Sequence, residues 1–531
     1  MPCGPSPGIE IIADHEATIT NGNIKATVSR RGKIVIYDSK GNKLLEEYVR
    51  HRQDPKDSKC SALTVEAREL RPTLGGDYHL TMRFESLDHE EKIFGMGQYQ
   101  QPYLNLKGTD LELAHRNSQA SVPFAISSLG YGFLWNNPGI GRAVLGTNEQ
   151  LLNIAREHRR REVPLDLIVI DFFHRKHQGE WSFDSEFWPD PEAMVKELKE
   201  LKAELMVSFW PTVENASENF PEMLEQGLLI RHDRGMRIAM QCDGDITHFD
   251  ATNPAARKYI WSKAKQNYYN MGIKTFWLDE AEPEFSIYDF DIYRYHAGSN
   301  LQIGNTFPKE YTRGFYEGMT AEGQTNIVNL LRCAWAGSQK YGTLVWSGDI
   351  ASSWSSFRTQ LAAGLNMGLA GIPWWTTDIG GFHGGNPDDP AFRELFTRWF
   401  QWGAFCPVMR LHGDREPKPA GQPTATGADN EIWSYGDAIF EICKRYIGIR
   451  EQLREYTRGL MRVAHERGTP VMRTLFCEFP LDERAWEIET QYMFGSTYLV
   501  VPVLEPGQRR IKAYLPGWSI VEALGQEGYC V

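Results

Sequence analysis

The residues with the clearest capacity for chemistry lie in the stretch 275–284, Thr-Phe-Trp-Leu-Asp-Glu-Ala-Glu-Pro-Glu. Its first half is apolar, as expected for a buried strand, and its second half contains Asp279, Glu280, Glu282 and Glu284. In a parallel α/β barrel the carboxyl ends of the strands form the active-site face, so an apolar run that breaks into acids indicates a catalytic strand. Asp279, which ends the strand, is therefore the candidate nucleophile. At least two of the glutamates are expected to be ion-paired or solvated.

Polar and aromatic residues also follow the other apolar runs of strand length. They are Asp171, Trp210, Arg332, Ser347-Gly-Asp349, Asp378 and Arg410-Leu-His412. In a barrel all of these side chains face one mouth, which would contain several carboxylates, an arginine, a histidine and tryptophans. Such a set suits retaining glycoside hydrolysis, in which two carboxylates about 5–5.5 Å apart act as nucleophile and acid/base. Tryptophan rings would add an apolar platform for a sugar.

Each of these residues could instead have a purely structural role. A strand-end aspartate such as Asp171 is often a turn or helix-cap residue. Arg332 could simply neutralise a buried carboxylate, Trp346 could belong to the core, and His412 could be a hydrogen-bonded core histidine. The residues alone therefore indicate a carboxylate-lined barrel without defining its substrate.

The elements that would position these residues begin near residue 149, where a helix is expected over 149–161. From there apolar strands and helices alternate, which is typical of a parallel α/β sheet. Seven expected strands cover residues 167–170, 204–210, 275–279, 326–331, 343–346, 371–375 and 405–409. A (β/α)₈ barrel needs eight. The one candidate for the first strand, at 142–146, could equally end the preceding β region.

The chain is expected to contain three domains. Residues 1–146 show short alternating runs separated by Gly, Asn and Asp turns, which predicts a β-sandwich. Residues 147–467 are expected to form a TIM-type barrel that lacks its first strand. Residues 468–531 return to a β pattern and are expected to form a truncated C-terminal β-domain.

The composition of the 531-residue chain is that of a globular protein, with 41% hydrophobic and 24% charged residues. Its net charge of −12 argues against a nucleic-acid partner. No apolar run approaches the roughly 18 residues of a membrane span. The eight cysteines form no CxxC pair, and the N-terminus lacks the apolar core of a signal peptide, so we expect a cytoplasmic protein.

Four motifs, taken together, resemble those of glycoside hydrolase family 31. They are Phe276-Trp-Leu-Asp-Glu-Ala-Glu-Pro-Glu284, Trp346-Ser-Gly-Asp349, Asp378-Ile-Gly-Gly-Phe382 and Arg410-Leu-His-Gly413. The Asp-Glu-Ala-Glu-Pro-Glu form is similar to the α-xylosidase branch of that family rather than to its α-glucosidases. The resemblance covers about residues 90–505.

The resemblance implies an exo-acting, retaining α-glycoside hydrolase that releases non-reducing-end xylose from xyloglucan-type oligosaccharides. It implies Asp279 as the nucleophile and Asp349 as the acid/base, with no metal or organic cofactor. The residues that it implies for gripping the sugar are Asp171, Phe172, Phe173, Trp210, Trp277, Arg332, Trp346, Asp378 and His412.

The chain departs from the family pattern in two places. Family members carry a segment with the first barrel strand between the sandwich and the first barrel helix, whereas here Gly146 runs almost directly into that helix. The family pattern is also lost after Gly517. An open barrel edge would expose unpaired backbone groups, so impaired folding or activity is a hypothesis at this stage.

Two other functions stay open on the sequence alone. An α-glucosidase of the same family would use the same catalytic residues, because the preference for glucose or xylose depends on loop geometry. A sugar-binding homologue without activity would follow if the missing segment disables the barrel, and binding of xylosides without turnover would favour it. An oligosaccharide is the expected partner, and the oligomeric state is left open.

Overall fold

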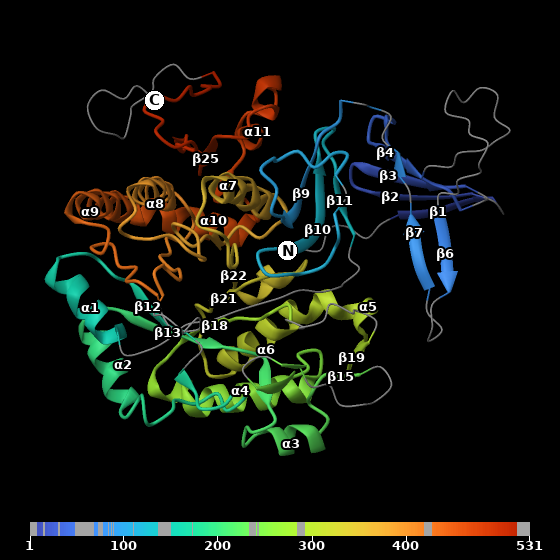
Figure 1. The fold of residues 1–531 in the computed structure, drawn as a ribbon. Coiled ribbons are helices and arrows are strands. Elements are labelled where there is room, and N and C mark those ends of the chain that lie inside the picture. The colour runs from blue at the N-terminus through green and yellow to red at the C-terminus, as the bar shows by residue number, and fades with distance from the viewer. Residues whose placement is uncertain are drawn as a thin grey trace. The chain divides into compact units, whose positions relative to one another are not determined.

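The computed structural model divides the chain into two compact units, Met1–Ile93 with Ser127–Tyr131 and Phe94–Ile126 with Gly132–Val531. Figure 1 shows the helices and strands of both units. The structure describes residues 8–517 except 14–15, 30–31, 48–67, 73–77, 83, 86–87, 89, 110, 136–149, 172–173, 233–239, 242–243, 284–291 and 419–426. The domain boundaries expected at 146 and 467 stay predictions.

The first unit is built from antiparallel strands, as expected for this region. Its six-stranded sheet has the order β1-β2-β3-β4-β5-β8, and β6 pairs with β7 in a separate hairpin. The strands are β1 (Gly8–Ala13), β2 (Glu16–Asn21), β3 (Ile24–Val28), β4 (Ile34–Asp38), β5 (Lys43–Glu47), β6 (Arg68–Pro72), β7 (Tyr78–Met82) and β8 (Phe84–Glu85). The buried carboxylate of Glu47 accepts the Ile34 N–H (2.7 Å) and the Arg68 guanidinium (2.9 Å), which ties β4 and β5 to β6.

The three-stranded sheet β11-β10-β9 belongs to the second unit except for its end residues Ile93 and Ser127. These strands are β9 (Ile93–Gln98), β10 (Ala120–Ser127) and β11 (Gly132–Leu134). At Gly97, with φ +100°, a Cβ would lie 2.2 Å from the Ala120 carbonyl oxygen, so only glycine allows the close approach of β9 to β10. The Gln98 amide donates to the Trp346 carbonyl (3.0 Å) and accepts from the Trp375 indole (2.8 Å), which fastens β9 to the central sheet.

The central sheet of the second unit is parallel, with the order β12-β13-β18-β21-β22-β23. Its strands are β12 (Leu167–Ile170), β13 (Glu204–Phe209), β18 (Thr275–Leu278), β21 (Asn329–Leu331), β22 (Thr343–Trp346) and β23 (Trp375–Thr376). Because side chains alternate along a strand, Phe276 faces the large core while Trp277 joins an inner cluster with Met206, Leu330 and Trp346. The strand–helix alternation expected from the sequence is confirmed.

The helices that cover this sheet cross over between its strands (Figure 1). The described helices are α1 (Gln150–Arg160), α2 (Pro191–Glu200), α3 (Phe220–Glu225), α4 (Pro254–Asn267), α5 (Asn300–Ile303), α6 (Phe307–Ala321), α7 (Trp354–Leu369), α8 (Pro390–Gly403), α9 (Asp437–Gln452), α10 (Arg454–Arg467) and α11 (Leu475–Glu478). Two of these helices begin with a side-chain cap: Asp190 accepts the Ala193 N–H (2.9 Å), and Asn253 accepts the Ala255 N–H (2.9 Å).

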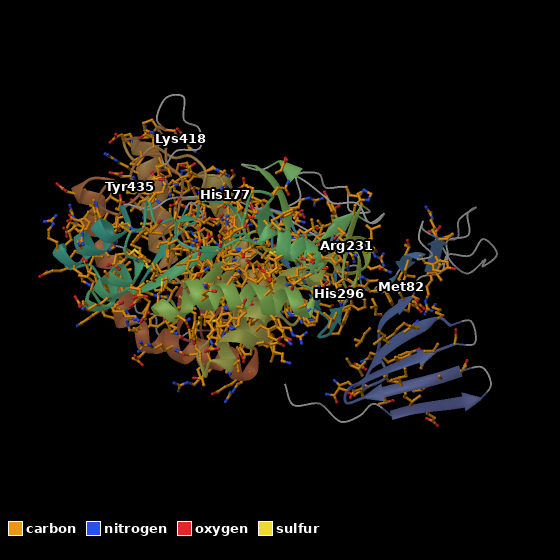
Figure 2. All side chains as sticks on the ribbon, turned by 90° about the horizontal axis from the view of Figure 1, so that it is seen from below. Met82, His177, Arg231, His296, Lys418 and Tyr435 are labelled. Carbon is orange, nitrogen blue, oxygen red and sulfur yellow. The ribbon has the colours of Figure 1, made fainter. Side chains whose placement is uncertain are left out.

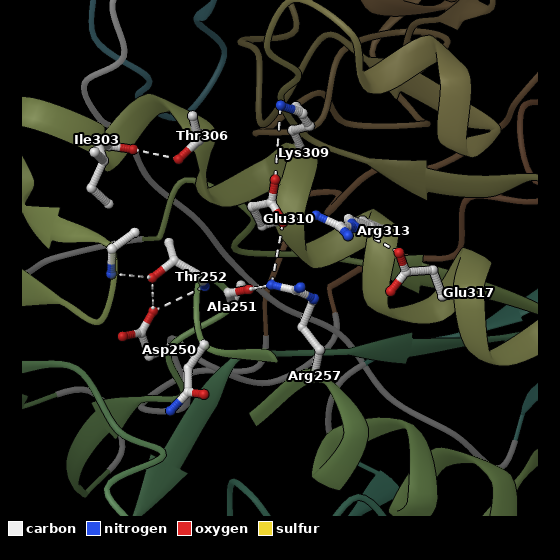
Figure 3. Close-up of polar contacts among 12 residues, drawn as sticks. Asp250, Ala251, Thr252, Arg257, Ile303, Thr306, Lys309, Glu310, Arg313 and Glu317 are labelled. Carbon is white, nitrogen blue, oxygen red and sulfur yellow. Dashed lines mark hydrogen bonds and ion pairs between the residues drawn. The ribbon is translucent and has the colours of Figure 1, made fainter. Parts of the chain in front are cut away.

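Helices α4 and α6 lie side by side and are joined by a charged contact (Figure 3). Arg257 of α4 donates to the Ala251 carbonyl (2.8 Å) and lies 3.2 Å from the Glu310 carboxylate of α6. The ring of Trp261 packs directly on Gly318, where a Cβ would lie 2.2 Å from the indole. The Arg257–Glu310 contact ties the start of α6 to α4.

One of the seven expected strands is wrong, and another is mostly misplaced, because β23 begins only at Trp375, the last residue of the expected strand 371–375. Residues 405–409 form turns and bends rather than a strand, although Val408 still contacts β23 through Trp375 O (3.4 Å) and Thr376 Oγ1 (2.9 Å). Pro407 lacks the N–H that a regular ladder needs at this position. At the other edge, the candidate first strand at 142–146 lies outside the described residues, and within them no strand pairs with the free side of β12.

The second unit also contains three shorter sheets among its described residues. The sheets β14-β17-β16, β15-β19-β20 and β24-β25-β26 comprise β14 (Thr212–Glu214), β15 (Arg231–His232), β16 (Met240–Gln241), β17 (Asp245–His248), β19 (Tyr293–Tyr295), β20 (Gly298–Ser299), β24 (Met472–Arg473), β25 (Tyr492–Phe494) and β26 (Tyr498–Val500). Figure 2 shows Arg231 of β15 near His296 in the β19–β20 turn. Within the described ranges, no helix combines the length and apolarity that a membrane span requires.

Candidate active site

Asp279 follows directly on β18 at the carboxyl edge of the central sheet. Its N–H donates to the Phe209 carbonyl (3.1 Å), which extends the pairing with β13 by one residue and fixes where the side chain leaves the strand. Asp279 is 1% exposed. The next residue, Glu280, has φ +49°, a conformation that is costly for a residue with a Cβ and is concentrated at functional sites.

The guanidinium of Arg332, just past β21, joins three carboxylates. Its Nε lies 2.6 Å from Glu282 Oε1 and 3.8 Å from Asp279 Oδ1, and its Nη1 donates to Asp349 Oδ2 (3.3 Å). Arg332 and Glu282 are completely buried. Because Asp279 and Asp349 both lie within 4 Å of this one guanidinium, the two candidate catalytic carboxylates are brought together, as the sequence predicted.

The carboxylate of Asp349 has a partner that sequence reasoning missed. Asp349 follows β22 and the turn at Ser347-Gly348, and its Oδ2 accepts a hydrogen bond from Asn117 Nδ2 (2.7 Å). Its N–H donates to Asn117 Oδ1 (2.9 Å). Asn117 comes from a loop 232 residues earlier in the chain and ends no apolar run, so the strand-end pattern could not have found it.

A second group of predicted residues surrounds Arg410. Its Nη1 donates to Asp378 Oδ1, and its guanidinium lies 4.9 Å from the Trp277 ring and 5.4 Å from the Trp346 ring. The two indoles pack edge to face at 5.2 Å. The sequence placed Arg410 at the barrel mouth but not among the residues expected to grip the sugar.

His412 connects Asp171 to this group. Its Nε2 lies 3.8 Å from Asp171 Oδ2, and its ring packs at 5.4 Å against Trp277. Burial, with the positive charges of Arg410 and Arg415, lowers the pKa of His412 well below its usual range, so the ring is neutral. His412 can therefore exchange hydrogen bonds with hydroxyl groups without adding charge to the site.

Trp210 is buried at the end of β13, where the Arg175 guanidinium lies 5.2 Å from its ring. Phe172 and Phe173, which were expected to form an aromatic wall, lie outside the described residues. Within the described part of the chain, no group of His, Cys, Asp and Glu side chains is arranged to hold a metal ion.

Several buried polar atoms in this group make no hydrogen bond with the described residues. They are Nε1 of Trp277, Nε1 of Trp346, Nη2 of Arg410 and Oδ2 of Asp378. Buried donors and acceptors are costly unless they are paired, so their concentration at one edge of the sheet indicates a polar ligand. Three donors and one acceptor suit a ligand with several hydroxyl groups, each of which can both donate and accept.

The carboxylates of the site have raised pKa values. Burial raises the pKa of Asp279 to about 6, against the opposing charge of Arg332 and with a contribution from the negative charge of Asp349. Burial also raises the pKa of Glu282 and of Asp378 to about 7, against the charges of Arg332 and Arg410 respectively. Clusters of buried acids with shifted pKa values are typical of catalytic sites.

The fold and this carboxylate cluster at the strand ends define a glycosidase of the TIM-barrel class, and the chain belongs to glycosyl hydrolase family 31. Residues 6–141 match the family's N-terminal galactose mutarotase-like domain. Residues 129–459 match its TIM-barrel domain, and residues 468–526 match its C-terminal domain. The chain is thus a glycosyl hydrolase, as its motifs predicted.

Relatives within the family include both glucosidases and xylosidases. The chain is 50% identical over 474 residues to a protein of Pseudescherichia vulneris described as an uncharacterized family 31 glucosidase, covering 77% of this chain and 89% of that one. It is 30% identical over 515 residues to an α-xylosidase of Saccharolobus solfataricus, covering 83% and 66% of the two chains. The crystal structure of a family 31 α-xylosidase from a soil metagenome, complexed with xylose, superposes with a TM-score of 0.92 at 50% identity, covering 97% of this chain and 87% of that one.

Proposed function

We propose that the protein is a retaining, exo-acting α-xylosidase that removes xylose from the non-reducing ends of xyloglucan-type oligosaccharides. The observation that carries the proposal is the contact of Asp279 and Asp349 with the single guanidinium of Arg332. This contact holds two carboxylates from different strands side by side, as a double displacement requires. The similarity to α-xylosidases supports the choice of sugar.

In the first step Asp279 attacks the anomeric carbon and the glycosidic bond breaks. Asp349, in its acid form, donates a proton to the departing oxygen, and a covalent ester between the sugar and Asp279 results. Arg332 keeps Asp279 ionised although burial opposes its charge. The leaving sugar chain departs as an alcohol, so atoms and charge balance.

In the second step Asp349 accepts a proton from water while the water oxygen attacks the anomeric carbon. The ester bond breaks, Asp279 regains its negative charge, and xylose leaves with the α configuration. Esterification of Asp279 has meanwhile removed a negative charge next to Asp349, which favours the ionised form of Asp349 that this step needs. The surrounding residues Asp378, Arg410 and His412 would bind the hydroxyl groups of the terminal sugar.

The comparison of two aryl glycosides tests the choice of sugar. We expect kcat/KM for 4-nitrophenyl α-xyloside to exceed that for the α-glucoside by at least about tenfold, because a pocket shaped to one sugar discriminates by such factors. A preference for the glucoside would replace xylosidase by α-glucosidase. Binding of xylose without turnover of either substrate would contradict the proposed activity and favour a sugar-binding protein.

The pKa of Asp279 predicts the acidic limb of the activity profile. Asp279 reacts only when ionised, so on the acidic side of the profile kcat/KM is expected to fall about tenfold per pH unit below about pH 6. Initial rates with an aryl α-xyloside check this, with thermal stability measured at each pH to exclude unfolding. A rate that stays constant down to about pH 4.5 would contradict the assigned role.

A further inference from the structure

We propose that Asn117 is a positioning residue that determines which oxygen of Asp349 carries the catalytic proton. The inference rests on the proposed function, because it concerns the acid/base of that reaction. Asn117 and Asp349 form a reciprocal pair: the amide Nδ2 donates to Oδ2 (2.7 Å), and the backbone N–H of Asp349 donates to Oδ1 of the amide (2.9 Å).

The orientation of the Asn117 amide follows from its neighbours. Its Oδ1 also accepts a hydrogen bond from the Ser118 hydroxyl (3.3 Å), so two donors point at this atom. A reversed amide would place an NH₂ group against the Asp349 N–H, which cannot accept a hydrogen bond. Nδ2 is therefore the atom that faces Asp349, and it can only donate.

The loop that carries Asn117 packs directly against the turn that carries Asp349. Ser118 and Gly348 both have left-handed conformations, with φ +65° and +75°. A Cβ on Gly348 would lie 2.3 Å from Ser118 N, so only glycine permits this approach. The two backbones thus define the distance between the amide and the carboxylate.

Buried hydrogen bonds hold the Asn117 loop from its other side. His115 is completely buried, its Nδ1 accepts the Ser121 N–H (3.2 Å), and its Nε2 faces the Asn305 carbonyl (3.3 Å). Burial lowers the pKa of His115 to about 3, so the ring is neutral and Nε2 is the donor. Asn305 in turn donates to the Leu113 carbonyl (2.8 Å) and lies two residues before α6, whose start is tied to α4 by the Arg257–Glu310 contact (Figure 3).

The consequence concerns the two oxygens of Asp349. Oδ2 accepts from Asn117 Nδ2 and from Arg332 Nη1, and neither nitrogen can accept a proton in return. Oδ1 makes no hydrogen bond with the described residues. The acid form of Asp349 therefore carries its proton on Oδ1, and we infer that Oδ1 delivers it to the leaving oxygen and later accepts a proton from water.

Two replacements test this role by measurements that a purely structural residue would leave unchanged: the dependence of kcat/KM on the leaving group, and the pH at which kcat/KM falls on the alkaline side. In Asn117→Ala, kcat/KM is expected to fall about 10²-fold for a xylosyl-glucose disaccharide, whose leaving group needs protonation, and less than about threefold for α-xylosyl fluoride, whose leaving group does not. In the isosteric Asn117→Asp, a second carboxylate beside Asp349 is expected to move the alkaline limb of kcat/KM upward by about one pH unit.

Gln119→Ala is the matched control. Gln119 lies in the same loop and donates to the Ala114 carbonyl (2.7 Å) without contacting Asp349, so it should change both substrates equally and leave the alkaline limb in place. The inference would be overturned if Asn117→Ala lowered kcat/KM equally for both substrates. It would also be overturned if Asn117→Asp left the alkaline limb of the kcat/KM profile at the same pH. If Asp349→Ala itself shows no dependence on the leaving group, the proposed function fails; if only Asn117→Ala lacks that dependence, the positioning role alone fails.

Discussion

Replacement of Asp279 by asparagine is expected to lower kcat/KM for an aryl α-xyloside by at least about 10⁴-fold. Asparagine fills the same space but cannot form the ester with the anomeric carbon, so the first displacement has no nucleophile. Initial-rate assays at high enzyme concentration measure the residual rate. Folding should be preserved, because the replacement removes a buried charge whose pKa is already raised by desolvation.

Asp250→Asn provides the matched control for that experiment. Asp250 is also a buried aspartate of the second unit, but it accepts hydrogen bonds from Thr252 (Figure 3) instead of contacting Arg332. Its other oxygen accepts the His296 N–H. We expect this variant to keep kcat/KM within about tenfold of the parent, with any loss appearing in thermal stability. Substantial turnover by Asp279→Asn would remove Asp279 from the role of nucleophile.

Replacement of Asp349 by alanine is expected to produce the second largest effect, and one that depends on the leaving group. For a xylosyl-glucose disaccharide, kcat/KM should fall about 10²–10⁴-fold, because the departing oxygen is no longer protonated. For a dinitrophenyl xyloside the first step needs little acid assistance, so the glycosyl-enzyme should form and accumulate. A burst of dinitrophenol followed by slow turnover would report this.

Azide distinguishes loss of the acid/base from general damage at the site. Azide attacks the glycosyl-enzyme without first giving up a proton, so it should restore turnover of the dinitrophenyl substrate by Asp349→Ala and form α-xylosyl azide. Chromatography and NMR identify the product and its configuration. Uniform loss with every leaving group, together with no response to azide, would contradict the acid/base role of Asp349.

The sequence predicted much of this arrangement because the relevant patterns are local. Apolar runs of strand length followed by polar residues placed five of the seven proposed strands, and with them Asp279, Arg332 and Asp349, while a sixth shares only Trp375 with the expected range. The strand expected at 405–409 was wrong because its apolar run resembles a strand while Pro407 interrupts the ladder.

Other features depend on contacts between distant segments and leave no local signal. Four acids follow β18, and the sequence does not indicate that Asp279 and Glu282 are the two that lie within 4 Å of the Arg332 guanidinium among the described residues. Asn117 reaches Asp349 across 232 residues, and the glycine that allows this approach, Gly348, looked like an ordinary turn residue. The pKa values of the acids follow from burial, which periodicity cannot supply for a residue beyond the end of a strand.

The central claim is that Asp279 forms a covalent bond with the sugar, and trapping that intermediate tests it most directly. A fluorinated α-xylosyl fluoride, which slows the second step more than the first, would be incubated with the intact chain, followed by digestion and mass spectrometry of the peptides. We predict one label per chain, on Asp279, and no label in Asp279→Asn. A label on Glu282 or Asp349, or turnover of the reagent without any covalent adduct, would contradict the claim.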